Sequence, residues 1–570
     1  PYYIDDTTGE MTDTYFTRQN TDEFQGAFSS NDGGTNSTNF HPILMANDSY
    51  RNLNTKEQKM TVRANWYILP ELTFYGYVSM KYNTSKTETF LPQAATGVVS
   101  TNTFANRSSD YYSNNFSLQS EAKLIYAKDW LDKKHQFTAT ALWRTSQSRS
   151  SNTTSTRYNV ASAAIADPGS GGGVLLSQGS GKSEVRSLSG IGSVVYTFLD
   201  RYTVNGTVNY EGKSSLARDN RWGIFPSLGA SWIVSDEPFM KWAKPALTEA
   251  KIRASYGMSG NAPSGTSPYV GTYSAAGNYM DGAAVTINTM QLNKLKWETS
   301  REVDLGVDLN FFNGDLTATF DWYRKNTSDL LQKNVELPAA TGLPTARIGW
   351  YNSGKIRNEG WEFRIEYQAL KTKDWNLRLN YNVNRNKNTI VELPQNINEE
   401  QFSLKNGAYA QRLISGTAVG SFFGFKYAGV YQNLEDTYAK DADGGIMYDM
   451  QGKPIVMKNG TYTCYPGDAK YEDINHDGKI DKNDIVYIGN SNPLLSGGGG
   501  FTLTVFLHYR LGQKIINKAR MNAESMYGAD NQSTAVLRRW RNEGDVTDVP
   551  RALWKYGYNY LGSDRFVESC

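Results

Sequence analysis

The residue types best suited to chemistry gather in one acidic segment, DINHDGKIDKND, which begins at Asp473. Within it, oxygen-bearing residues fall at positions 1, 3, 5, 9 and 12, and glycine stands at position 6. This spacing is typical of calcium-binding loops of the EF-hand type, because Ca²⁺ prefers oxygen ligands and the glycine permits the sharp turn that they require. The predicted ligands are Asp473, Asn475, Asp477, Asp481, Asp484 and the backbone carbonyl of Lys479.

The last position of this segment departs from the EF-hand pattern. Asp484 replaces the bidentate glutamate that normally ends the loop, so dockerin loops are the closer likeness. Such a site would bind weakly, at extracellular millimolar calcium, and would be structural rather than catalytic. The alternative is an Asx-rich turn without a metal. We predict Ca²⁺ as a structural cofactor of an extracellular insertion at residues 471–490.

An aromatic segment, FFGFKY, follows a glycine-rich stretch upstream of the acidic loop. Aromatic faces stack on sugars and on peptides, which makes this segment a candidate for substrate binding. The alternative, which the pattern favours, is that the rings form part of a membrane-interface girdle or pack within a hairpin. The candidate residues are Phe422, Phe423, Phe425 and Tyr427.

The remaining motifs give no support for an enzyme. The four histidines form no metal-binding cluster, and the sequence has no nucleophile-elbow, phosphate-loop or paired-cysteine motif. We interpret Gly497–Gly500 as a flexible or discontinuous stretch. The basic run Arg538–Arg541 predicts a short extracellular helix, Ala535 to Asn542, with a solvated face or one that contacts lipopolysaccharide or a capping partner. A net charge of +2 gives no nucleic-acid footprint.

Most of the chain consists of stretches in which apolar and polar residues alternate. Tyr202–Tyr210 places Tyr, Val and Gly on one face and Thr and Asn on the other. A strand separates these sets cleanly, because its successive side chains point to opposite faces. The same alternation runs through Val303–Phe311, after which Asn313-Gly314 predicts a tight hairpin turn. About twelve such strands are recognisable, each of roughly nine to eleven residues, the length that crosses a bilayer at a barrel tilt.

The connections between these strands are asymmetric. Tight turns are predicted at 68–71, 199–201 and 312–315. The alternate connections are long and polar, and they cover about 83–115, 145–185, 259–298, 325–358 and 385–420. Short turns on one side and long loops on the other are typical of outer-membrane barrels, and the sequence has no apolar run of the roughly 18 residues that a spanning helix needs. The predicted fold is all-β, a large antiparallel transmembrane β-barrel with long extracellular loops.

Several segments, in order along the chain, resemble SusC/RagA-type TonB-dependent transporters. They begin with RDNRWGIFPS at 218–227, SDEPF at 235–239 and KIRASYG at 251–257. Later matches are WET at 297–299, NSGKIRNEG at 352–360 and GQKIIN at 512–517. Together they are far more specific than any one short motif. On these segments, residues 1–570 are identified as part of the β-barrel domain of a TonB-dependent receptor.

The resemblance implies a 22-stranded barrel in a bacterial outer membrane, plugged by an N-terminal domain. It also implies a SusD-like surface lipoprotein that captures nutrient, and TonB, which pulls on the plug from the periplasm. The expected activity is active import of polymeric nutrients, foremost oligosaccharides. Oligopeptide import by the same family and a passive porin-type barrel are the alternatives. Further expected contacts are outer-membrane lipid, lipopolysaccharide and a second transporter–lipoprotein pair, which together would form a dimer.

The chain also departs from the family pattern. We find no TonB box, plug or N-terminal extension in these 570 residues, and we expect the last strands to lie outside them as well. The tetraglycine runs directly into Phe501, where family members carry another strand and turn. Phe566–Cys570 ends where the final strands should follow. We therefore expect discontinuities near residues 500 and 568.

Overall fold

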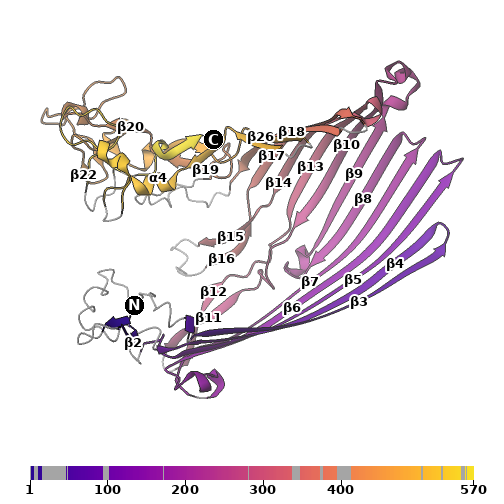
Figure 1. The fold of residues 1–570 in the computed structure, drawn as a ribbon, viewed down its shortest axis with the longest axis horizontal. Coiled ribbons are helices and arrows are strands. Elements are labelled where there is room, and N and C mark those ends of the chain that lie inside the picture. The colour runs from indigo at the N-terminus through magenta and orange to yellow at the C-terminus, as the bar shows by residue number, and fades with distance from the viewer. Residues whose placement is uncertain are drawn as a thin grey trace.

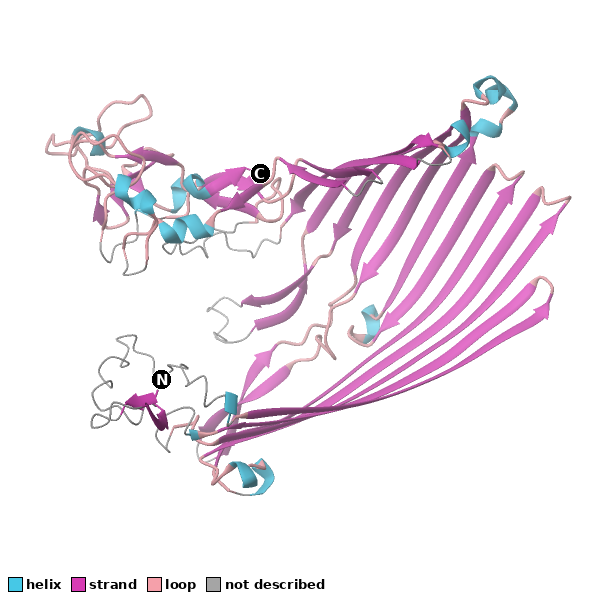
Figure 2. Ribbon diagram, in the orientation of Figure 1, coloured by secondary structure: helices cyan, strands magenta, loops and turns pink. Residues whose placement is uncertain are grey.

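Strands dominate the structure, a computed structural model, and its helical segments are short (Figure 2). It describes residues 2–4, 11–15, 46–47, 49–93, 102–170, 172–279, 282–336, 347–372, 376–393, 413–501, 505–527, 531–553, 559 and 561–569. Fourteen of the 29 described strands, among them every strand longer than eight residues, form one antiparallel sheet, in the order β27-β26-β18-β17-β14-β13-β10-β9-β8-β7-β6-β5-β4-β3 (Figure 1). Over the described residues the structure has no helix that is long and apolar enough to cross a membrane.

The sheet follows the chain order with few interruptions, as antiparallel hairpins require. Its strands are β3 (Tyr50–Leu69), β4 (Leu72–Leu91), β5 (Arg107–Trp130), β6 (His135–Tyr158), β7 (Val174–Phe198), β8 (Tyr202–Lys213), β9 (Trp222–Ile233), β10 (Leu247–Asn261), β13 (Glu298–Phe311), β14 (Leu316–Ser328), β17 (Lys355–Lys371), β18 (Asn376–Glu392), β26 (Leu495–Phe501) and β27 (Val505–Leu511). The described residues thus place 14 strands in this sheet, more than the count from alternation and fewer than the 22 that the resemblance implies.

One face of the sheet is apolar across its width, and the other is polar. In the middle, Val307 of β13 lies opposite Phe320 of β14, which lies opposite Phe363 of β17. The alternate positions carry Asp308 and its partner Thr319. Because the register keeps the apolar set on one side, the two faces suit two different solvents. The apolar face fits bilayer lipid, and the polar face fits a wet interior.

Aromatic rings bound the apolar face at two levels. Near the tight turns, Tyr202 stacks on Phe198 and on Trp232, with centroids 6.1 and 6.2 Å apart. Farther along β8, Tyr210 stacks on Trp222 at 4.8 Å. Two aromatic rows around an apolar band of about 25 Å are the pattern of an outer-membrane barrel. This pattern places the β8 segment between Tyr202 and Tyr210 inside the membrane.

The connections alternate in length as predicted, except around β9, where 214–221 at the long-connection end is shorter than 234–246 at the tight-turn end. Short turns close one end of the sheet, and at one of them Asn313 (φ 57°) and Gly314 (φ 92°) form the predicted hairpin turn. The long connections gather at the opposite end (Figure 2). Two of these carry a small second sheet of the order β11-β12-β16-β15. Its strands are β11 (Thr272–Tyr279), β12 (Gly282–Thr289), β15 (Leu331–Glu336) and β16 (Arg347–Asn352), and separately β1 (Tyr2–Ile4) pairs with β2 (Met11–Tyr15).

Two predicted loops, 83–115 and 145–185, are largely strand. β4 to β7 have 20 to 25 residues each and continue past the apolar band toward the long connections. Alternation could not reveal this part, because Ser, Thr and Asn occupy both of its faces. The strands nevertheless pair residue by residue, so the backbone ladder extends into a polar wall beyond the membrane level. The true connections shrink to 92–106 and 159–173.

The interpretation of Gly497–Gly500 as a flexible stretch is wrong, whereas the expected discontinuity near residue 500 stays a prediction. These glycines lie inside β26, which pairs with β18 and β27. A Cβ on Gly497 would come within 2.3 Å of the Asn382 carbonyl oxygen, so the close approach of the strands requires glycine. Pairing is continuous up to Phe501, and residues 502–504 lie outside the described part of the chain.

The prediction for the basic run is also wrong in extent. The 3₁₀ segment Thr534–Arg538 forms, but Arg539 leaves the helical region at φ −58° and ψ 149°. No helix therefore covers Ala535 to Asn542. Near the second expected discontinuity, β29 (Val567–Ser569) pairs with β28 (Lys514–Ile516), and Cys570 lies outside the described residues.

Candidate functional site

The largest folded body outside the sheet stands at the long-connection end (Figure 1). It consists of residues 413–494, between β18 and β26, and the described residues of 514–569, after β27; we call it the cap. Besides β28 and β29, it contains β19 (Ser421–Gly424), β20 (Tyr427–Val430), β21 (Lys458–Asn459), β22 (Tyr462–Thr463), β23 (Ala469–Tyr471), β24 (Lys479–Ile480), β25 (Val486–Asn490) and the helix α4 (Lys518–Ala523). The hairpin β26–β27 separates the two segments in sequence, so adjacent strands deliver both of them to the cap.

An apolar core joins the two segments of the cap. Phe425, 2% exposed, packs against Tyr471 with ring centroids 5.6 Å apart. Leu561, from the second segment, is buried in the same core. The other buried members are Phe423, Tyr431, Ala439, Met457, Cys464, Ala469, Ile480 and Ile485. The core is therefore complete only when both segments are in place.

Buried polar contacts fix how the two segments meet. The carboxylate of Asp468, 0% exposed, accepts hydrogen bonds from the Arg551 guanidinium at 2.7 and 3.3 Å. Asn559 accepts from the backbone N–H of Ala469 at 2.9 Å and donates to the carbonyl of Arg551 at 3.2 Å. A buried carboxylate without its partner is costly, so the Asp468–Arg551 pair disfavours any other arrangement of the segments.

A second ion pair joins Glu524, which follows α4, to Arg565, and Arg565 also contacts the aromatic segment. Arg565 donates to Glu524 at 2.8 Å, and both side chains are buried. The Arg565 guanidinium also lies 5.0 Å from the ring centre of Tyr427. Burial raises the pKa of Tyr427 to about 12, so its hydroxyl stays protonated and donates to the carbonyl of Asp548. A second core contains Phe566, whose ring lies 5.3 Å from the Arg565 guanidinium, together with Met521, Met526, Val536 and Val549.

The predicted calcium loop lies at the surface of the cap, and its side chains bond to its own backbone. Asp473 accepts from the backbone N–H groups of Asp477 and Gly478, at 3.3 and 2.8 Å. Asp477 accepts from the N–H of Lys479 at 2.8 Å and from the side-chain amide of Asn475 at 3.0 Å. Gly478 has a φ of 79°, which supplies the sharp turn expected at position 6.

Asp484, the predicted last ligand, is buried and closes the loop. One of its oxygens accepts from the N–H of Ile474 and the other from the N–H of Asp481, both at 2.8 Å. Asp481 accepts in turn from the N–H of Asn483 at 2.8 Å. Burial raises the pKa of the Asp484 carboxyl above its ordinary value. The segment is thus held in a ring-like shape by side chain–backbone bonds.

The donor set of this loop consists of oxygens, as Ca²⁺ requires, but most of the carboxylate oxygens already accept N–H groups. Over the residues that the structure describes, no three His, Cys, Asp or Glu side chains are arranged around a common metal position. The loop therefore keeps its shape through its own hydrogen bonds. Calcium binding by Asp473, Asn475, Asp477, Asp481, Asp484 and the Lys479 carbonyl stays a prediction.

The four aromatic candidates do not share one environment. Phe423 and Phe425 are buried in the first core, where their faces contact protein. Phe422 and Tyr427 are half-buried, and the Tyr427 ring packs on Tyr471 as well as on Arg565. Packing thus occupies the two most buried rings, and substrate binding by Phe422 and Tyr427 stays a prediction.

Two adjoining cavities open in the cap, and the first lies beside the predicted calcium loop. The first, of about 340 Å³, is lined in part by Tyr438, Lys440, Glu472, Asp473 and His476. The second, of about 550 Å³, is lined in part by Gln432, Thr547 and Asp548. They share Ala428, Asp436 and Lys470, and the Lys470 ammonium pairs with the Asp436 carboxylate at this common wall. Paired charges and amide groups equip the cavities to hydrogen-bond a polar solute.

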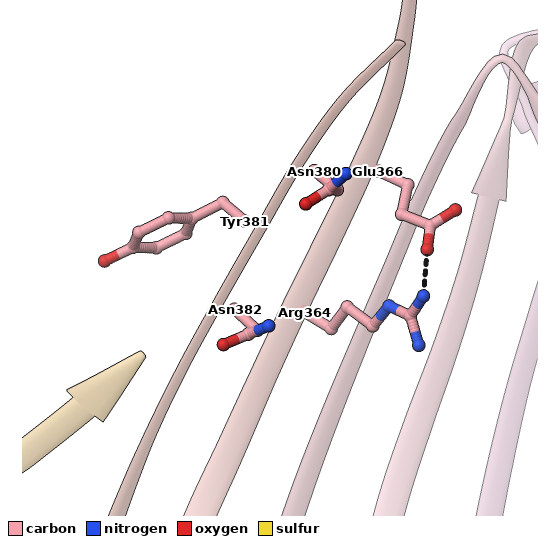
Figure 3. A pocket seen from close by; sticks show the side chains of 5 residues that line it. All are labelled: Arg364, Glu366, Asn380, Tyr381 and Asn382. Carbon is pink, nitrogen blue, oxygen red and sulfur yellow. Dashed lines mark hydrogen bonds and ion pairs between the residues drawn. The ribbon is translucent and has the colours of Figure 1, made fainter. Parts of the chain in front are cut away.

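A third hollow, of about 300 Å³, lies over β17 and β18; it is lined by Arg364, Glu366, Asn380, Tyr381 and Asn382 (Figure 3). Arg364 forms an ion pair with Glu366 on β17, and the two asparagines lie opposite them on β18. The polar face of β18 continues with Asn384, Asn386 and Asn388. This row offers amide donors and acceptors without net charge.

Sequence reasoning missed a small core at the mouth of the sheet. Trp297 lies 5.2 Å from the Phe225 ring, and its Nε1 donates to the carbonyl of Arg221 at 3.2 Å. Leu216 and Leu295 complete this core. A usable signal was Phe225 itself, a large ring among glycine and serine on the polar face of β9. The Asp468–Arg551 pair left no comparable signal in the sequence.

Comparison with known proteins places this architecture. The profile of the family described as "TonB dependent receptor-like, beta-barrel" matches residues 1–471. TonB-dependent receptor P3 of Formosa agariphila is 28% identical over 398 residues, which cover 67% of this chain and 37% of that protein. TonB-dependent receptor SusC of Bacteroides thetaiotaomicron is 31% identical over 299 residues, 49% of this chain and 28% of that protein. The matched residues thus cover well under half the length of each of these two relatives.

Among solved structures, the RagAB peptide transporter matches with a TM-score of 0.73. The match covers 92% of this chain and 55% of that chain, at 18% identity. At this identity the likeness speaks for the fold alone. It agrees with the large antiparallel sheet.

Proposed function

Because the chain belongs to the TonB-dependent receptor-like β-barrel family, we propose that it serves as the barrel of an active nutrient importer in the bacterial outer membrane. The observation that carries this proposal is the two-faced sheet of 14 described strands, with the cap standing at its long-connection end. An apolar outward face and a polar inward face are what a protein-lined passage through lipid requires. The cap and its cavities stand where a solute would arrive.

We propose oligosaccharides as the cargo. The polar face of β18 carries its asparagine row, and Ser496 of the neighbouring strand β26 adds a hydroxyl beside Asn384. Neutral donors and acceptors of this kind match hydroxyl-rich sugars, and the charges beside them are paired with each other as Arg364 and Glu366. Oligopeptide import is the alternative, and its support is the fold likeness to the RagAB peptide transporter.

The proposed partners follow from the family resemblance. A SusD-like lipoprotein would sit at the long-connection end, where the cap offers a folded surface. TonB would supply the energy from the periplasmic side, and two transporter–lipoprotein pairs would form a dimer. Passive diffusion through a porin-type barrel is the competing mechanism, and it differs by needing no TonB.

Deletion of the gene and growth on single carbon or nitrogen sources tests the proposal. We expect slower growth on one class of oligosaccharide, unchanged growth on peptides, and rescue by the intact gene only when TonB is present. A growth defect confined to peptides would replace the cargo assignment. Rescue without TonB would favour the porin, and normal growth on every polymer and peptide would contradict nutrient import.

A further inference from the structure

A group of charged side chains lies on the outward face of the polar wall that β4 to β7 form. It stands just past the aromatic row of Tyr210 and Trp222, toward the long connections. Tyr210 of that row lies opposite Gly190 of β7. From this level toward the long connections, the outward positions of β7 are Leu188, Arg186, Glu184 and Lys182. Lipid-facing residues therefore give way to charge within two positions of the aromatic row. This is the depth at which outer-leaflet headgroups replace hydrocarbon.

One carboxylate organises this group. Arg149 of β6 lies opposite Glu184 of β7 and donates to it at 3.3 Å. Arg186 donates to the same carboxylate through Nε at 2.7 Å, and Gln147 donates to it at 2.6 Å. The arginine side chains are nonetheless 59% and 63% exposed, and Glu184 is 30% exposed. A guanidinium has five N–H donors, so both arginines keep donors that point away from Glu184.

The group carries net positive charge. Arg149, Lys182 and Arg186 provide three cations around the single anion Glu184. The inward face of the same wall at this level is neutral, with Ser148, Ser150, Ser183 and Ser187. If water covered both faces of the wall, solubility would give no reason for the charged side chains to lie on the outward face alone. The nearby outward group of Lys86, Glu88 and Asp110 has one cation and two anions, so it carries no such excess of positive charge.

We propose that Arg149, Lys182 and Arg186 form a binding site for the phosphate group of an outer-leaflet lipid. Arginine forks match phosphate oxygens bidentately, and Lys182 adds a point charge on the same side. Glu184 holds both guanidiniums in place, so the arginine side chains lose less conformational entropy when a phosphate binds. The site rests on the proposed outer-membrane location, but it depends on neither the cargo nor TonB.

The test uses the full-length transporter purified in detergent and probed with phosphorylated lipid A in micelles. Native mass spectrometry measures the bound lipid for the wild type and for the variant Arg149→Ser/Lys182→Ser/Arg186→Ser. A cation beside a charged lipid is worth up to about fivefold in affinity, so we expect the loss of all three to lower the affinity for lipid A roughly tenfold to a hundredfold. The matched control is Lys128→Ser/Lys133→Ser/Lys134→Ser, which removes equal charge at the tight-turn end of β5 and β6.

Dephosphorylated lipid A and inorganic phosphate serve as the two further probes. We expect the wild type not to bind dephosphorylated lipid A. We also expect it to bind free phosphate far more weakly than phosphorylated lipid A. In the wild type, lipid binding should also weaken with added salt, which tests the site without any variant. Equal lipid binding by wild type and triple variant, an equal loss in the control, or indifference to the phosphate would each overturn the site. Failure of the nutrient-growth experiment alone would leave it standing.

Discussion

The sheet and the cap solve the problem of apolar burial in opposite ways. The sheet repeats one backbone ladder, and its apolar face needs no protein partner because lipid covers it. The cap is not covered by lipid, so its apolar residues pack against one another, and its buried carboxylates Asp468 and Glu524 form ion pairs with arginines. A defect in the sheet is therefore confined to one strand face, whereas a defect in the cap separates two distant segments of the chain.

The largest effect should come from breaking the buried ion pair of the cap. Arg551→Leu leaves Asp468 buried without its partner, and we expect the cap to lose about 3–5 kcal/mol of unfolding free energy. Hydrogen exchange should show faster exchange throughout the cap and no change in the sheet. Lys426→Leu is the control, because its partner Glu472 is exposed, and it should cost at most about 1 kcal/mol. Similar losses in both variants would contradict the contrast between cap and surface.

The corresponding break in the sheet is Val307→Arg. This charge would lie near the middle of the lipid face, where we expect a cost of about 2–4 kcal/mol. Ser255→Arg puts the same side chain on the wet face of the neighbouring strand β10 and should cost little. Denaturant unfolding from vesicles, followed by tryptophan fluorescence, measures both. If the two variants were equally destabilised, the assignment of the faces would fail.

A smaller and more local effect is expected from calcium. Asp473→Ala combined with Asp477→Ala should abolish bound metal and speed proteolysis of residues 471–490 at millimolar calcium. Lys479→Ala should keep the metal, because only the backbone carbonyl of that residue is a predicted ligand. Metal content by elemental analysis, with and without chelator, gives the readout. Unchanged metal content in the double variant would remove calcium from the loop.

The smallest perturbation concerns the buried thiol of the cap. Burial raises the pKa of Cys464 to about 12, so the folded thiol stays protonated where a free thiol ionises. In a Cys570→Ser background, iodoacetamide at pH 9 should modify Cys464 only after unfolding. Because the unfolded thiol ionises near 9.0, the unfolding free energy of the cap should fall as the pH rises from about 9 to about 12. Alkylation of the folded protein at the rate of a free thiol would show that the cap opens readily.

Alternation predicted the sheet because the two faces of each strand are decided by local sequence. Val303–Phe311 needed no knowledge of its neighbours to be placed correctly. The same rule failed for the polar wall, where both faces meet water and the pairing of β4 to β7 leaves no apolar mark. It also failed at Gly497–Gly500, whose strand character comes from the neighbouring strands rather than from its own side chains.

The cap was beyond such reasoning because its contacts join residues far apart in the chain. The spacing of the acidic loop correctly predicted a sharp turn at Gly478, which depends on residues only a few positions away. The sequence made Phe425 a candidate for stacking on a ligand, but in the structure it is buried against Leu561 and Tyr471. Periodicity carries no information about such meetings, and neither does a motif.

The split of the cap by the β26–β27 hairpin sets an order on its biogenesis. The segment at 413–494 emerges from synthesis with half a core, and Phe425 stays open to solvent until Leu561 has been made. Asp468 likewise waits for Arg551. The residues of the β26–β27 hairpin are thus synthesised before the cap can be completed. Until then the first segment exposes apolar surface that favours aggregation, so we expect a chaperone to bind it.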